Sequence, residues 1–437
     1  MRARRRLVVH GAVVAGLLLA APFVPRGPEP EAASRTGPPA PAPVTVLDGP
    51  ARGSLAGDRA FLEAVRRLPW SDDEPTGNLG IRSVVFAGDV PGARWALVVG
   101  RVLGPPDAPG SPADGPAGRS GLVAVWFGGP PGAAPEGLTR LTPPARAPDD
   151  APLGLLDQRT GTLVVVAAPG DVVEVSERPE IAEDSSIYRP FRTVKTTDGV
   201  AVARLRPSDV PVTTAAVYRV VRDGRTVARS APTTIGNRFG APTPVAVEHP
   251  RGRPSDAAAE AVRWTAERVL APLGLARHEI RLTALWAGNV PGPGPESGTV
   301  AVVAATLPNR AAVVDGEWLL PVASASGDYL QVGDCGLGIL PAGPPVEQRV
   351  HVLSCEVVDP THGDAVVQTV LLVVAPPQVA LVRIYDGDSR FLVELPTVDG
   401  VVVTPMPPGT ATVEAVTAGG VSLGRTRLLG RGVDFEG

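Results

Sequence analysis

Residues 85–92 are Val85-Phe86-Ala87-Gly88-Asp89-Val90-Pro91-Gly92, and residues 285–292 are Leu285-Trp286-Ala287-Gly288-Asn289-Val290-Pro291-Gly292. Three further stretches recur in the same order along the chain: 63–66 at 260–263, 163–169 at 371–377, and 198–200 at 399–401. Recurrence at nearly one offset is the pattern that an internal repeat produces. The sequence therefore predicts a tandem duplication, with copies too long to be solenoid units or propeller blades.

Each copy is expected to begin with a helix and to continue with β-strands. Apolar residues at helical spacing mark the helices, Phe61 and Val65 in the first copy and Val262 and Val269 in the second. Val-rich runs between Gly and Pro follow, which is typical of strands. Shorter strands follow at the end of each copy, and the turns between them are spaced as in a β-sandwich. We predict a mainly β fold with α+β elements, each copy being a helix plus an antiparallel sheet followed by a small Ig-like β-sandwich.

The repeat and the local composition divide the chain into seven predicted segments. The linkers are rich in Pro, Ala and Gly and cannot bury enough apolar surface to fold, so we expect extended spacers there. The segments are a signal anchor or transmembrane segment (1–24), a Pro/Ala-rich linker (25–46), the α+β domain (47–180) and small β-sandwich (181–235) of copy 1, a second linker (236–253), and the α+β domain (254–376) and small β-sandwich (377–437) of copy 2.

The amino terminus has the features of a membrane signal. Four arginines lie within residues 2–6, and residues 7–24 contain no charged residue. Eighteen helical residues span about 27 Å, close to the thickness of a bilayer core. Because a basic flank stays in the cytoplasm, we expect a single-pass protein of the cell membrane with its body outside. Secretion after cleavage of a signal peptide is the alternative.

Composition narrows the classes of function. The chain carries 41 basic and 45 acidic residues, and several of the arginines lie in the amino-terminal 44 residues, which leaves the body acidic. A nucleic-acid partner is not expected, because an acidic surface repels the phosphate backbone. Neither a phosphate-binding loop nor a hydrolase nucleophile motif is present. We therefore predict no cofactor, no metal and no catalytic residue.

Cys335 and Cys355 are the only two cysteines. Outside the cytoplasm such a pair is expected to form a disulfide. Asp334-Cys335-Gly336-Leu337 also resembles, superficially, the nucleophile motif of the NlpC/P60 cell-wall peptidases. That family carries its cysteine on a helix, and three residues that disfavour a helix follow here: Gly338, Pro341 and Gly343. We predict a structural disulfide, with a cysteine peptidase as the alternative.

Two polar clusters are possible metal sites. His362 lies between Asp359 and Asp364, and residues 72–74 are all acidic. A zinc site at His362 would need two more converging ligands. Nothing near residues 72–74 has the spacing of an EF-hand. Turn-forming neighbours account for both clusters as polar loops.

The repeated motif admits a structural and a ligand-binding interpretation. In the structural one, Phe86 and Trp286 end a buried strand, and the other residues form the turn into the next strand: Gly88, Asp89, Pro91, Gly288, Asn289 and Pro291. In the other, Phe86 and Trp286 line a groove. We predict the structural role, and we expect the other tryptophans of the strands to lie in the core: Trp95, Trp126 and Trp318.

The basic tail, the apolar span, the Pro/Ala spacer and the motif at 85–92 together resemble membrane-anchored extracytoplasmic proteins of actinobacteria. That group has no established activity, so the resemblance implies architecture and location and transfers no catalytic residue. We therefore expect a non-enzymatic, membrane-tethered protein that binds another component of the cell envelope, a protein or a glycan. A secreted or anchored envelope hydrolase or a glycan-binding protein is the alternative.

Overall fold

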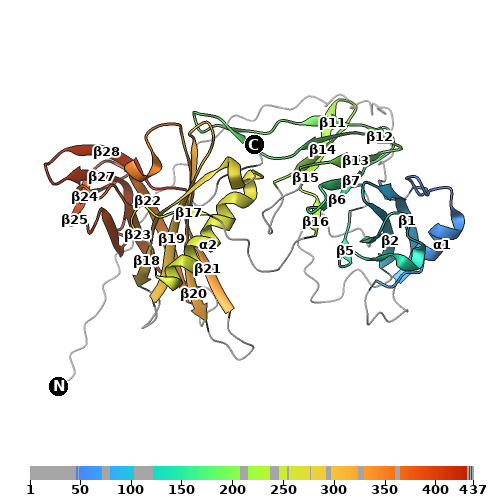
Figure 1. The fold of residues 1–437 in the computed structure, drawn as a ribbon, viewed down its shortest axis with the longest axis horizontal. Helices are drawn as coiled ribbons and strands as arrows, with labels where there is room; N and C mark the ends of the chain where they lie inside the picture. The colour runs from blue at the N-terminus through green and yellow to red at the C-terminus, as the bar shows by residue number, and fades with distance from the viewer. Residues whose placement is uncertain are drawn as a thin grey trace, which may run out of the picture. The chain divides into compact units, whose positions relative to one another are not determined.

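The structure, a computed structural model, describes residues 46–47, 49–70, 79–102, 122–148, 150–206, 215–236, 246–252, 255–275, 277–291, 297–322, 329–359, 365–430, 433 and 435. The described chain is mainly β with few helices, which confirms the predicted mainly β fold with α+β elements (Figure 1). The segment 1–24, most of 25–46, and residues 72–74 and 360–364 lie outside the described residues. Within the described residues, no helix combines the length and the hydropathy that crossing a bilayer requires.

The first half of the described chain comprises residues 46–236. Its elements are α1 (Arg59–Arg66), β1 (Leu79–Val90), β2 (Ala93–Val102), β3 (Leu122–Gly129), η1 (Pro135–Gly137), β4 (Thr139–Arg140), β5 (Ala145–Arg146), β6 (Leu153–Asp157), β7 (Thr162–Val166), β8 (Val172–Ser176), β9 (Glu180–Ile181), β10 (Ile187–Tyr188), β11 (Arg192–Val194), β12 (Thr196–Thr197), β13 (Val200–Arg204), β14 (Val217–Arg222), β15 (Arg225–Ser230) and β16 (Thr233–Ile235).

The second half comprises residues 246–435. Its elements are β17 (Val247–Glu248), α2 (Asp256–Leu270), η2 (Ala271–Leu273), η3 (Arg277–Glu279), β18 (Arg281–Pro291), β19 (Ser297–Thr306), β20 (Ala312–Val322), β21 (Tyr329–Leu340), η4 (Val346–Gln348), β22 (His351–Asp359), β23 (Ala365–Val374), β24 (Val379–Asp386), β25 (Phe391–Pro396), β26 (Val401–Pro405), β27 (Thr410–Thr417) and β28 (Ser422–Arg427).

Each half stacks one helix and three sheets in the same order. In the first half, α1 covers the sheet β1-β2-β3-β4, which packs on β12-β13-β7-β6-β16, which packs on β11-β8-β14-β15. In the second half, α2 covers β17-β18-β19-β20-β21, which packs on β22-β23-β26, which packs on β25-β24-β27-β28. Figure 1 shows α2 lying across one face of its sheet. The shared strand order is a property of the structure, while the common origin of the halves stays a prediction.

The strands in the middle of each stack are buried on both faces. In β7, Leu163 and Val165 point into one core, and Val164 and Val166 point into the next. A strand with two buried faces consists of a continuous apolar run without polar alternation. This packing accounts for the recurrence of 163–169 in the second half, where β23 divides its residues in the same way: Leu371 and Val373 into one core, Leu372 and Val374 into the other.

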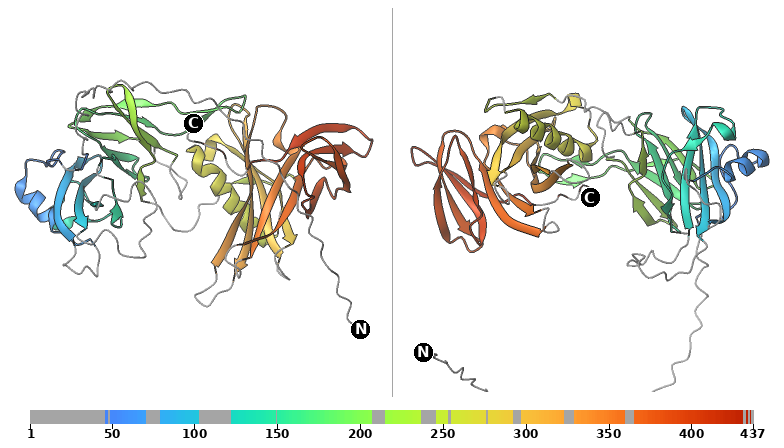
Figure 2. Two further views of the ribbon diagram at one scale, coloured as in Figure 1. Left: turned by 180° about the vertical axis from the view of Figure 1, so that it is seen from behind. Right: turned by 90° about the horizontal axis from the view of Figure 1, so that it is seen from below.

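The sheets cross the domain boundaries predicted at 180/181 and 376/377. In the first half β7 pairs with β13 and β8 pairs with β14. In the second half β23 pairs with β26, and Figure 2 shows β24–β28 packed beside β22 and β23. Each sandwich therefore begins at β6 or β22, before the predicted boundary. Pairing between strands distant in sequence depends on tertiary packing, which a run of apolar residues does not reveal.

The repeated Asp-Gly-Val stretch forms the same turn in both halves. Asp198 and Gly199 have φ of +49° and +76°, and Asp399 and Gly400 have φ of +51° and +76°. Positive φ at two successive turn residues is typical of a type I′ hairpin turn. A Cβ at Gly199 would lie 2.4 Å from the Ala167 carbonyl oxygen, and one at Gly400 would lie 2.4 Å from that of Ala375. Close backbone approach therefore requires glycine at both positions.

Candidate functional site

The repeated motif in the first half lies mostly within a strand. β1 continues through Gly88 and Asp89 to Val90, and only Pro91 and Gly92 connect it to β2. Gly92 has φ +81°, as the third residue of a type II turn requires. The Asp89 carboxylate pairs across the strands with Arg94 at 2.7 Å, which suits an exposed strand position. The expectation that the strand ends at the aromatic residue is therefore wrong; β18 also runs on through Gly288 and Asn289 to Pro291.

The glycine of the motif is explained by the aromatic residue two positions before it. Residues i and i+2 lie on the same face of a strand. A Cβ at Gly288 would lie 2.5 Å from Trp286 Cζ2, and one at Gly88 would lie 3.2 Å from the Ser54 backbone N and 3.3 Å from Phe86 Cζ. The Trp286 ring therefore lies over the backbone of Gly288, whereas Ser54 and Phe86 together limit the space at Gly88.

The two motif aromatics differ in burial. Phe86 is 2% exposed and belongs to a buried cluster that includes Val46 and Leu47, each 1% exposed, and Val200. Trp286 is only partly buried and packs at the edge of the corresponding cluster, together with Val401 and Val403. In the first half, the lead-in segment (residues 46–52), which precedes the first helix, thus completes the core around Phe86. Among the described residues of the second half, none covers the corresponding surface in this way.

A groove with a volume of about 810 Å³ lies at this surface. Ala284, Trp286 and Ala287 of β18 line one part of it. The remaining lining comes from the lead-in segment 249–252 and from the second sandwich: Pro377, Val398, Asp399, Val401 and Val403. Ligand sites in proteins typically measure about 300–1,000 Å³ and combine apolar lining with a few polar groups. The groove is therefore the candidate functional site.

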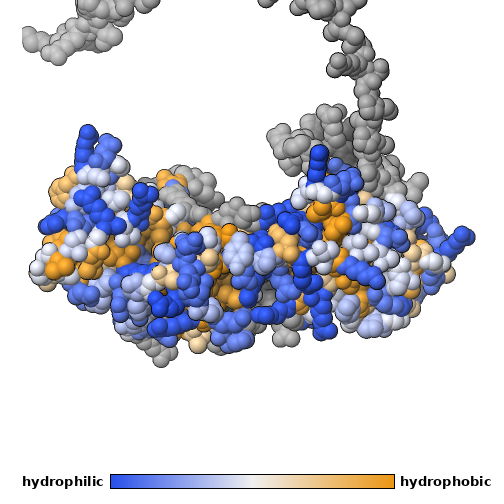
Figure 3. All heavy atoms as spheres, turned by 90° about the horizontal axis from the view of Figure 1, so that it is seen from above, coloured by the Kyte–Doolittle hydropathy of each residue, from blue (hydrophilic) through white to orange (hydrophobic). Residues whose placement is uncertain are grey.

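Exposed apolar side chains alone do not define a site on this protein. On the face drawn in Figure 3, hydrophobic residues form several patches between hydrophilic ones. Scattered apolar residues are normal on protein surfaces. Val398 is distinctive because it is 77% exposed and also lines the groove.

A buried acidic cluster lies under α2 in the second half. Asp315 and Glu317 of β20 are both almost completely buried, and Asp334 of β21 lies opposite Glu317. Arg268 of α2 pairs with all three, at 3.4 Å from Asp315 Oδ2 and 3.6 Å from Asp334 Oδ2, and also donates to Glu317 Oε1. Burial, partly offset by Arg268, raises the pKa of Asp315 to about 8. Burial also raises the pKa of Glu317.

Asp315→Asn is expected to make the stability less dependent on pH. The folded protein keeps the Asp315 proton up to about pH 8, whereas an unfolded aspartate loses it near pH 4. The contribution of Asp315 to the free energy of unfolding is therefore fully present below pH 4 and is lost as the pH rises to 8. Asparagine carries no such loss, so the variant should be more stable than the wild type at pH 8 and similar to it at pH 4. Urea denaturation across this range measures the difference, and a pH-independent difference would contradict the assignment.

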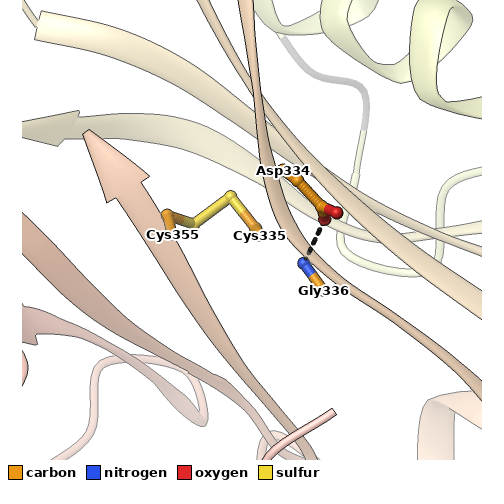
Figure 4. The surroundings of a disulfide bond; sticks show 4 residues. All are labelled: Asp334, Cys335, Gly336 and Cys355. Atoms are coloured by element: carbon orange, nitrogen blue, oxygen red, sulfur yellow. Dashed lines mark hydrogen bonds between the residues drawn. A yellow bond between two sulfur atoms is a disulfide. The ribbon is translucent and has the colours of Figure 1, made fainter. Parts of the chain in front are cut away.

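Cys335 of β21 and Cys355 of β22 lie at disulfide distance, with their sulfur atoms 2.09 Å apart. Both residues are fully buried in the core between the helix-bearing sheet and the sandwich. Figure 4 shows the disulfide on one side of β21 and the Asp334 carboxylate on the other. Asp334 Oδ1 accepts a hydrogen bond from the Gly336 backbone N at 2.7 Å. Cys335 therefore lies in a strand, and the bridge joins two layers of the second half.

A second cavity, of about 310 Å³, opens at one end of the first sandwich. Gln158 lines it, and both side-chain polar atoms of this buried residue have no hydrogen-bond partner among the described residues. The charged groups around it are paired: Arg178 with Glu180, Arg192 with Glu177, and Arg206 with Glu279, each at 3.3 Å. This pairing leaves little net charge to attract an ion, so the groove at Trp286 is the stronger candidate.

The structure confirms some of the remaining predictions from sequence, and others concern residues that it does not describe. Trp95, Trp126 and Trp318 are buried, as predicted for core residues. His362 and residues 72–74 lie outside the described residues, and the described part of the chain contains no cluster of His, Cys, Asp and Glu that could hold a metal ion. The roles of Val46, Leu47 and Arg268 were not predicted. A signal for the first two exists, because Pro43-Val44-Thr45-Val46 recurs as Pro244-Val245-Ala246-Val247.

No family model, no curated protein and no solved structure matches this chain. The function is therefore inferred from the groove at Trp286, the buried acidic cluster, the cysteine pair and the amino-terminal sequence.

Proposed function

We propose that this chain is a non-enzymatic, membrane-tethered extracytoplasmic protein that binds another component of the cell envelope. The observation that carries the proposal is the groove at Trp286. In the first half Val46 and Leu47 fill the corresponding place, whereas no described residue of the second half does so. The groove is of ligand size, and its lining combines apolar side chains with Arg251 and Asp399, so a partner that covers the apolar part gains free energy.

The tether and the location are supported by sequence and by the cysteine pair. Residues 2–24 combine a basic flank with an uncharged apolar stretch of bilayer length. A buried cysteine pair at disulfide distance is typical of proteins that fold in oxidising compartments.

A non-enzymatic role is supported by the position of the most perturbed acids. Asp315 and Glu317 have raised pKa values, which is a frequent property of catalytic groups. Their side chains are sealed beneath α2 and line neither the groove nor the cavity at Gln158. A substrate in either space would not reach them, and a general acid must lie within hydrogen-bond reach of the reacting group.

Cross-linking in cells tests the proposal. The full chain with an affinity tag is cross-linked and purified, and the material that accompanies it is identified by mass spectrometry. Val398→Asp places a charge at the groove, and Val421→Asp is the matched control, because Val421 is also exposed and lies in the second half but does not line the groove. We expect a recurrent envelope partner that is lost with Val398→Asp and kept with Val421→Asp.

A glycan partner is the second candidate, because a partly exposed tryptophan in a groove can stack against a sugar ring. Recovery of wall fragments without a protein in the same experiment would favour it. Equal recovery of all material with both variants would refute a binding function for the groove.

A further inference from the structure

The lead-in segments of the two halves correspond in sequence but differ in length. Pro43-Val44-Thr45-Val46 matches Pro244-Val245-Ala246-Val247, and Arg52-Gly53 matches Arg251-Gly252. Val46 and Arg52 are six positions apart, whereas Val247 and Arg251 are four positions apart. The first half thus has two additional residues between the matched valine and the matched arginine.

The two lead-in segments follow different paths. In the first half, Val46 and Leu47 are buried in the cluster of Phe86. In the second half, Val247 packs against the core on the α2 side, and Glu248 is exposed and pairs with Arg281. No aliphatic side chain of the described second lead-in therefore takes the place that Val46 and Leu47 take in the first.

The matched arginines show the same difference in their hydrogen bonds. Arg52 donates to the carbonyl oxygens of Ala167 and Asp198, and its Nη2 donates to that of Val46 at 2.7 Å. Arg251 donates to the carbonyl oxygens of Ala375 and Asp399, which correspond to the first two. Within the described residues, no carbonyl takes the third position. A guanidinium has five N–H donors, so Arg251 retains capacity to bind a carbonyl from a partner.

We infer that the groove at Trp286 binds a short peptide segment of a partner, with two adjacent aliphatic residues seated as Val46 and Leu47 are seated in the first half. The two side chains cover Trp286 and Val401, the counterparts of Phe86 and Val200, and a peptide carbonyl accepts a hydrogen bond from Arg251. The first half itself displays the complementary segment, which identifies the chemistry of the partner. This inference rests on the proposed function and specifies its partner.

Titration with a peptide tests the inference. A labelled, capped peptide with the sequence of residues 43–49, Pro-Val-Thr-Val-Leu-Asp-Gly, is added to the full chain and followed by fluorescence anisotropy. We expect saturable binding. Replacement of both aliphatic residues that correspond to Val46 and Leu47 by serine should weaken binding by about tenfold or more, because burial of aliphatic surface supplies most of the affinity.

The protein variants show whether the peptide binds in the groove. Val398→Asp should weaken binding by about tenfold, because it places a charge beside the aliphatic side chains. Val421→Asp should leave binding unchanged. Both positions are exposed, so neither change should alter the fold, and circular dichroism checks this.

The inference would be overturned by no saturable binding, by binding that is equal for the two protein variants, or by binding that does not depend on the aliphatic residues. Binding of soluble wall glycan at the groove in place of the peptide would also overturn it. If cross-links in cells still depend on Val398 after such a result, the proposed function stands and only the peptide class fails. If that dependence is absent as well, the proposed function fails with it.

Discussion

Replacing both Cys335 and Cys355 by alanine is expected to lower the free energy of unfolding of the second half by about 3 kcal/mol. The bridge closes a loop with a sequence separation of 20 residues, and its loss restores the entropy of that loop in the unfolded chain. The two residues also lie in the core between β21 and β22, so the variant loses buried contacts there. Denaturation by guanidinium chloride, followed through hydrogen exchange, measures the change.

The first half provides the internal control for this experiment. It contains no cysteine, so exchange protection in β1–β3 should be unaffected, while protection in β21 and β22 falls. Because both cysteines are fully buried, reductant under native conditions should cleave the bridge only as fast as the second half opens. An unchanged denaturation midpoint, or an equal loss of protection in both halves, would contradict the role assigned to the bridge.

Arg268→Met is expected to lower the free energy of unfolding by about 2–3 kcal/mol. Arg268 is the cation that pairs with Asp315, Glu317 and Asp334, and its loss removes the positive charge of this cluster together with the hydrogen bond to the buried Glu317. The expected effect is smaller than for a fully buried pair, because the Arg268 side chain is 38% exposed and water screens part of the interaction. Methionine keeps the apolar stem of arginine, so the change isolates the charge.

Two further variants separate charge from helix packing. Arg263→Met, on the same helix, removes an arginine that pairs with Glu260 and Glu267 at helical spacing, and it should change stability by less than about 1 kcal/mol. Combining Arg268→Met with Glu317→Gln removes a buried charge together with its partner and should recover part of the loss. Equal losses for Arg263→Met and Arg268→Met, or no recovery in the double variant, would show that the acidic cluster does not depend on Arg268.

Much of the architecture was predictable because its signals are local. α2 begins after Ser255, whose hydroxyl oxygen accepts a hydrogen bond from the Ala258 backbone N, and it ends at Leu270 before Pro272. The Asp-Gly turns and the Val-rich strands also depend on a few neighbouring residues, which is why they could be read directly. The cysteine pair was predictable because only two cysteines exist and the amino terminus indicates an oxidising compartment.

The strand pairing within each sandwich was not predictable in the same way. The order along the chain places β6 and β7 in the helix-bearing domain, because they directly follow its strands. In the structure they form a sheet of the sandwich. A strand buried on both faces shows no polar alternation that would indicate its neighbours.

The primary sequence was sufficient for the β character, the recurring stretches, the hairpin turns and the two cysteines, because each depends on residue type and spacing over short distances. Packing of the whole chain decided the acidic cluster and the candidate site. It places Arg268 over Asp315 and Glu317, about 50 positions further along the chain, and it buries Val46 and Leu47 beside Phe86 while Trp286 is only partly buried. These contacts form between segments that are distant in sequence. The two-residue difference between the lead-in segments can therefore be interpreted only from the packed structure.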